Sequence, residues 1–267
     1  MTPTPNQLLW CLASLLCISG CGSVGADATP TVTAPSGVWL DTVRYNAGFD
    51  TSGVTIGDDN SLTIVSTTGD TITIEVGYLV TYWATLVSCE TVAQSSAAVQ
   101  ARAVSPNDHG EDLDPSSLVQ SRLESLTPPS DVQLGTISFE ETEYCRTHYL
   151  VGEVTDALAD TLPESPDLFG LSLYIEGFVS YEDGDVEALL IQSDLAYGEL
   201  YYLSGVISNL DSSSEARALE LTFTRNLGTL FDGVQIRGAT QSELAFGVLS
   251  NLIGGILVEG TLQDALD

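Results

Sequence analysis

The sequence predicts an all-β domain, mainly an antiparallel β-sandwich or barrel-like fold, with one or two short helices. Three observations point to this class. Apolar residues recur at every second position after Val38, β-branched and aromatic residues dominate these segments, and turns rich in Gly separate them at short intervals. In a chain of 267 residues, an apolar content of 43% also allows a substantial core.

The first predicted element pair is a hairpin over residues 62–76. Apolar residues alternate there with threonines on both sides of the turn at Gly69, which is the pattern of strands with one buried face. The next segment, 78–87, is almost entirely apolar or Thr, so we expect a strand that is buried on both faces.

The later strands have the same composition. The pair Asp183-Gly184 lies between two of them and suits a tight hairpin turn. These strands are expected at residues 132–139, 144–151, 171–181, 186–193, 199–207 and 218–224.

Two segments are predicted to be helical. Residues 115–126 begin with Pro and Ser and carry leucines on one side. Residues 240–253 offer Thr240 or Ser242 as a cap, followed by apolar residues at helical spacing. The uncharged stretch that continues to Val258 is short for a membrane helix, so we expect the second helix to lead into a final strand.

The N-terminal residues carry a different pattern. An apolar stretch from Leu8 is too short to span a bilayer and ends in Ile18-Ser19-Gly20-Cys21. This order, an aliphatic residue, two small residues and Cys, resembles the lipobox of bacterial lipoproteins. The resemblance implies cleavage before Cys21, lipidation of its thiol and export. The alternatives are a signal peptide that is cleaved elsewhere and a buried helix that ends in Gly-Cys.

The resemblance divides the chain into three parts. Residues 1–20 would be a signal peptide, residues 21–37 the lipidated Cys and a flexible tether, and residues 38–267 a single β-rich domain. Residue 22 is Gly, so the aspartate that retains lipoproteins in the inner membrane of enteric bacteria is absent. By that analogy the protein is attached to the cell envelope at the outer membrane, on its periplasmic face or at the cell surface.

The cysteines are consistent with export. Two of the five lie in the predicted signal peptide and Cys21 would carry lipid, which leaves Cys89 and Cys145. Disulfides persist in oxidising compartments, so we expect a disulfide between these two. Two free buried cysteines, or a metal site with two thiolates, are the alternatives.

The charge balance excludes one class of partner. The chain has 37 acidic residues and 7 basic ones, all Arg. Binding to nucleic acid depends on Lys and Arg that neutralise phosphates, so nucleic acid is not expected as a partner. Anionic lipids would repel the domain, so the expected contact with the membrane is the lipid anchor.

Residues around the two cysteines also resemble a group of proteins. Val87-Ser88-Cys89-Glu90, a long polar insertion and Tyr144-Cys145-Arg146 follow one another as in poorly characterised β-rich envelope lipoproteins. These are loosely akin to the periplasmic copper-associated partners of the methanobactin type. Some of them have a His-rich insertion, whereas this insertion holds only His109.

The acidic insertion suggests an alternative function, divalent-cation binding. Calcium takes six to eight oxygen ligands from carboxylates and carbonyls on a flexible loop. No twelve-residue helix-loop-helix pattern is present, and acidic runs are usually solvated surface. No other cofactor is expected. The candidate calcium ligands are Asp108, Glu111, Asp112 and Asp114.

Catalysis has little support in the sequence. The nucleophile-elbow, zinc-helix and phosphate-loop motifs are absent. A hydrolase with a Ser-His-Asp triad would have to use His109 or His148, the only histidines, and a carboxylate pair of the glycosidase type could be assembled from the 37 acidic residues in too many ways to be informative. The sequence therefore favours a non-catalytic binding or structural role at the envelope, with an envelope protein or a small ligand as partner.

Overall fold

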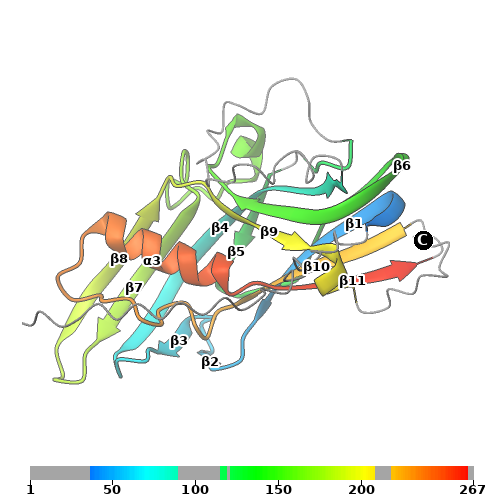
Figure 1. Cartoon of the computed structure of the whole chain (residues 1–267). Coiled ribbons are helices and arrows are strands. Elements are labelled where there is room, and N and C mark those ends of the chain that lie inside the picture. Colours follow the sequence, from blue (N-terminus) through cyan, green and yellow to red (C-terminus); the bar gives the residue numbers. More distant parts are fainter. Residues whose placement is uncertain (1–36, 90–114, 119–120, 208–217, 264–267) are drawn as a thin grey trace, which may run out of the picture. The chain divides into compact units, whose positions relative to one another are not determined.

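The structure is a computed structural model, and it describes residues 37–89, 115–118, 121–207 and 218–263. These residues belong to one compact unit. They form a strongly curved sheet of 11 strands with a few short helices (Figure 1). The predicted all-β class is confirmed.

The strands follow one another along the chain with short connections. They are β1 (Val38–Asp50), β2 (Val54–Ile56), β3 (Leu62–Val65), β4 (Thr71–Ser88), β5 (Arg122–Ser125), β6 (Val132–Val151), β7 (Leu173–Ser180), β8 (Val186–Ser193), β9 (Tyr197–Tyr202), β10 (Ala218–Asn226) and β11 (Leu257–Gln263). The helical segments are the 3-10 helix η2 (Asp156–Thr161), α2 (Leu203–Val206) and α3 (Gln241–Gly254).

Two long strands organise the sheet. The main path runs β11-β10-β1-β6-β4-β3-β2. β4 pairs with β3 and β7 over its first half and with β6 over its second half. β6 in turn pairs with β1 and then with β9. Because each long strand changes partners along its length, the sheet can curl around a core on one face.

The structure corrects several sequence-based expectations. The segments at 132–139 and 144–151 are one strand, β6, and the hairpin strand at 71 continues to Ser88. The end of the strand expected at 199–207 is the short helix α2. The pairing is not wholly antiparallel, because β1 and β10 run parallel.

The helix predicted at 115–126 is wrong. Arg122–Ser125 is strand β5, which pairs with Tyr78–Thr81 of β4. The residue spacing was compatible with a helix, but an open edge of β4 offers this segment a ladder of hydrogen bonds. Tertiary pairing therefore overrides a weak local preference.

The predicted C-terminal helix is confirmed as α3, and a capping box explains why it begins where it does. Thr240 is the N-cap: its hydroxyl accepts from the Glu243 N–H at 3.3 Å, and the Glu243 carboxylate accepts from the Thr240 N–H at 2.9 Å. This capping box satisfies N–H groups that a helix start leaves without partners. α3 buries its apolar face in the main core and contacts β8, β9 and β10.

A second, smaller core lies apart from the main one. It contains Val80, Val154, Leu158, Leu168 and Tyr174, so the segment around η2 covers part of β4, β5 and β7.

Across the described ranges, no helix combines the length and apolar character needed to cross a bilayer.

Candidate functional site

The segment from Asp232 to Arg237, between β10 and α3, is bordered by two cavities. Their volumes are about 450 Å³ and 530 Å³, and both are lined by Gly233, Val234 and Gln235. Cavities of a few hundred Å³ are the usual size for small-molecule sites. These two adjoining cavities are the candidate site.

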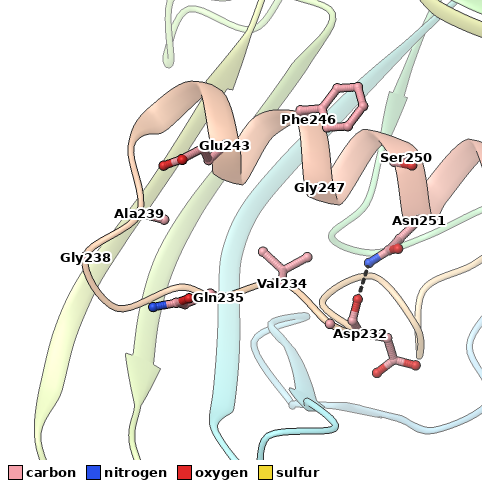
Figure 2. Close-up of a pocket in the computed structure, with 11 residues that line it drawn as sticks. Asp232, Val234, Gln235, Gly238, Ala239, Glu243, Phe246, Gly247, Ser250 and Asn251 are labelled. Carbon is pink, nitrogen blue, oxygen red and sulfur yellow. Dashed lines mark hydrogen bonds between the residues drawn. The ribbon is translucent and has the colours of Figure 1, made fainter. Parts of the chain in front are cut away.

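The first cavity lies between this segment and α3 (Figure 2). The Asn251 amide holds the segment by donating to the carbonyls of Leu230 and Asp232, at 3.1 and 2.8 Å. Gly247 keeps the space open, because a Cβ there would lie 3.1 Å from a methyl group of Val234. Phe246 projects from α3 away from the segment (Figure 2), and the walls combine apolar side chains such as Val234 with polar groups such as Asn251.

The second cavity lies between two hairpin turns and the same segment. Thr68 and Asp70 come from the β3–β4 turn, and the residues from Tyr181 to Asp183 come from the β7–β8 turn. Arg237 fastens the segment to the second turn, with nitrogen–oxygen distances of 2.6 Å to Asp183 and 3.2 Å to Asp185. Its guanidinium also lies 3.9 Å above the centre of the Tyr181 ring.

The electrostatics of the two cavities are acidic. Asp70, Glu182 and Asp183 line the second cavity, where Arg237 is the opposing charge, and Asp232 and Glu243 line the first. The hydrogen bond from Arg237 holds the pKa of Asp183 below its ordinary value, so this carboxylate stays ionised. Such walls favour cationic or hydroxyl-bearing ligands over anions. Neither histidine nor cysteine is found among the lining residues, so the cavities present carboxylates but no imidazole or thiol.

Apart from the cavities, a network of polar side chains lies deep inside the core. Arg225 on β10 is fully buried and pairs with Glu124 of β5, with 2.5 Å between Nη2 and Oε2. Its Nη1 donates to the Tyr149 hydroxyl. The Thr81 hydroxyl donates its proton to the Glu124 carboxylate, and it therefore accepts the hydrogen bond from the Tyr149 hydroxyl. Burial raises the pKa of Tyr149, which keeps its hydroxyl protonated. None of these four residues lines either of the two cavities. We therefore interpret the network as part of the core.

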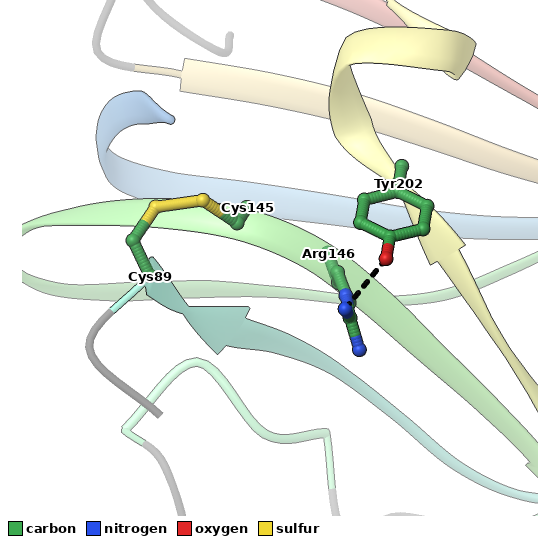
Figure 3. Close-up of a disulfide and its surroundings, with 4 residues drawn as sticks. All are labelled: Cys89, Cys145, Arg146 and Tyr202. Carbon is green, nitrogen blue, oxygen red and sulfur yellow. Dashed lines mark hydrogen bonds between the residues drawn. A yellow bond between two sulfur atoms is a disulfide. The ribbon is translucent and has the colours of Figure 1, made fainter. Parts of the chain in front are cut away.

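The predicted disulfide is present at one end of the sheet (Figure 3). Cys89 and Cys145 are joined with their Cα atoms 5.0 Å apart, within the usual range. Beside it, the guanidinium of Arg146 donates to the Tyr202 hydroxyl at 2.6 Å (Figure 3).

The predicted calcium ligands cannot be placed. Asp108, Glu111, Asp112 and Asp114 lie outside the described residues, as do His109 and Cys21. Within the ranges that are described, no group of three or more His, Cys, Asp or Glu is arranged to hold a metal ion. His148 lies on β6 with its ring 5.9 Å from that of Trp83, and it is not among the residues that line the two cavities.

Sequence reasoning missed the cavity residues. The glycines at 233 and 238 indicate turns between β10 and α3, and both adopt a positive φ. No local sequence pattern, however, indicates that Arg237 forms ion pairs with a turn about fifty residues earlier in the chain.

Fold and site together define an all-β domain with a disulfide at one end and two adjoining acidic cavities. Comparison with models of protein families, with curated proteins and with solved structures finds no match to this chain.

Proposed function

We propose that this chain is an exported, lipid-anchored protein of the bacterial envelope with a non-catalytic binding role. The order Ile18-Ser19-Gly20-Cys21 carries the proposal. The disulfide supports it, because such bonds form and persist outside the reducing cytosol. The outer membrane is the proposed site of attachment.

The position of the cavities supports a binding role. β4 has 18 residues, which corresponds to about 55 Å along the strand. Cys89 follows its last residue, whereas the second cavity is lined by Thr68 and Asp70, just before its first. In a protein anchored near the disulfide end, the cavities would open away from the membrane. A small polar ligand that is neutral or cationic fits the charge of their walls.

Mass spectrometry of protein purified from its own host tests the anchor. We expect a processed chain that begins at Cys21 and carries acyl groups, and we expect Cys21→Ser to abolish both processing and membrane association. An intact initiator end, or a processed chain without acyl groups, would contradict lipid anchoring.

Amide NMR spectra recorded with choline, putrescine, glucose and acetate test the binding role. We expect an amine or the sugar to shift the amides of Gly233, Gly238 and Gly247 at millimolar concentration, and acetate to leave them unchanged. Gly247→Leu, which fills the first cavity, should weaken any response there. Gly205→Leu is the matched control, because open space surrounds that position. If none of the probes shifts these amides, or acetate shifts them most, the proposed ligand class is wrong.

A further inference from the structure

The first described residues lie directly beside the disulfide. Val38 pairs with Tyr144, and a Cβ on Gly37 would overlap the Sγ of Cys89. Gly37 lies sixteen positions after Cys21 in the sequence. If these residues form the flexible tether expected from the sequence, they would span about 22 Å on average, and a lipid on Cys21 would keep this end of the sheet close to the membrane.

The outer face of the sheet at this end carries exposed aromatic and aliphatic side chains. Trp39 is 57% exposed, between the buried Val38 and Leu40 that point into the core. On β9, Leu200 and Tyr202 are 47% and 48% exposed. Tyr201 between them points the other way, since its hydroxyl donates to the Ile253 carbonyl of α3.

The strand register brings these side chains together around β6. Trp39 lies opposite Glu143, Tyr202 lies opposite Arg146 and Leu200 lies opposite His148. All three exposed side chains therefore flank six consecutive residues of one strand. Figure 3 shows Arg146, which follows Cys145 on β6, and Tyr202 at the end of the neighbouring strand β9.

The chemistry of this surface suits lipid headgroups. Trp and Tyr combine an apolar ring with a polar group and are enriched where membranes meet water. Arg146 forms no ion pair with any described carboxylate, and its guanidinium lies 4.4 Å above the Tyr202 ring. It can therefore meet a lipid phosphate. The net charge of −30 opposes binding to anionic lipids, so the matching surface is zwitterionic.

We infer that Trp39, Leu200 and Tyr202 form a lipid-facing surface that holds the disulfide end of the domain against a zwitterionic membrane. This inference rests on the proposed lipid anchor. The anchor supplies the attachment, and the surface sets the orientation, with the two cavities directed away from the bilayer.

Tryptophan fluorescence tests the orientation. Of the three tryptophans, Trp10 lies in the predicted signal peptide, so Trp83→Phe leaves Trp39 as the single emitter of the processed protein. The acylated variant is purified from the host and studied in solution and on phosphatidylcholine vesicles. We expect acrylamide quenching of Trp39 to fall about threefold on the vesicles, because the ring enters the interface.

A matched reporter at the other end of β4 provides the control. Val186 is 63% exposed and pairs with Ser180, which in turn lies opposite the first residue of β4. In the variant Trp39→Phe, Trp83→Phe, Val186→Trp, quenching should be the same on vesicles and in solution. Equal protection of both reporters would contradict the orientation.

The outcomes separate this inference from the proposed function. If Cys21 carries acyl groups and the protein binds vesicles, but Trp39 stays as accessible as in solution, the lipid-facing surface is wrong and the anchor stands. If mass spectrometry finds no acyl groups, the anchor itself is wrong and the inference falls with it. Protection of Trp39 in native membranes but not on protein-free vesicles would assign the surface to a protein partner instead.

Discussion

The residue that most constrains the interior is Arg225. Among the described residues it is the largest fully buried side chain, and its Nε donates to the Gly48 carbonyl at 3.1 Å. The guanidinium also lies 4.1 Å above the ring of Phe49. A buried charge is tolerated only when it is paired and hydrogen-bonded, and these contacts satisfy that requirement.

Removing one partner of this pair should destabilise the protein strongly. We expect Arg225→Met to lower the free energy of unfolding by about 3–5 kcal/mol, because the Glu124 carboxylate is then buried without a counter-charge. Urea denaturation followed by circular dichroism measures the loss.

Two further variants test the cause. Replacing both partners, as Glu124→Leu with Arg225→Met, should recover much of the loss, since no lone charge remains. Arg237→Met breaks a solvent-exposed pair instead and should cost less than about 1 kcal/mol. Equal losses for Arg225→Met and Arg237→Met would contradict this account.

The position of Arg225 could be predicted from the sequence, but its partner could not. Leu219, Leu221 and Phe223 alternate along β10, and the same alternation places Arg225 on the apolar face. Glu124, however, lies in the segment that was predicted to be helical. Its approach to Arg225 depends on the pairing of β5 with β4, which no local pattern specifies.

At the scale of elements, α3 is the one whose ends the sequence specifies best. A Thr followed three residues later by Glu, before an apolar run, is the capping-box pattern, and the structure contains that box. The strand ends were harder to predict, because β4 and β6 continue through residues that resemble turns and exposed loops. Pairing with different neighbours along their length keeps them extended.

Loss of the cap should destabilise α3 and change the response to acid. Thr240→Ala is expected to cost about 1 kcal/mol. Hydrogen bonds from the Thr240 N–H and hydroxyl hold the pKa of Glu243 below its ordinary value of 4.5. The stabilisation from this carboxylate is therefore present above pH 4.5 and is lost as the pH falls through the folded-state pKa. Thermal melts at a series of pH values measure both effects.

Thr155 offers a matched control for the cap. It is the N-cap residue of η2, but its side chain makes no capping hydrogen bond. Thr155→Ala should therefore cost clearly less than Thr240→Ala. A similar cost at both positions would show that the hydrogen bonds of the capping box do not stabilise the fold.

At the scale of the whole molecule, the disulfide links parts of the chain that are far apart. It joins residues separated by 56 positions. On the chain-entropy model, closing a loop of this size stabilises by about 4 kcal/mol. We expect Cys89→Ser with Cys145→Ser to lose stability of this order in urea denaturation.

A reductant provides the control for this change. Dithiothreitol should shift the unfolding midpoint of the wild type to that of the double variant and leave the double variant unchanged. A reductant-dependent shift in the double variant would assign the effect to something other than this disulfide.

The sequence specified the class of the fold and the cysteine pair, but not the arrangement of the sheet. Alternation and turn residues are local signals, and they identified most strands. The parallel neighbours β1 and β10 are separated by more than 160 residues, and the cavities depend on where the segment after β10 is placed. These features follow from long-range packing, about which the local periodicity of apolar residues carries no information.

The parallel pairing of β1 with β10 also has a consequence for biogenesis. A chain is synthesised from its amino terminus, so one edge of β1 stays open until residues 218–226 have emerged. An uncovered edge strand is a template for aggregation. A nascent chain of this protein would therefore need shielding until late in its synthesis, and truncation before β10 would leave a product prone to self-assembly.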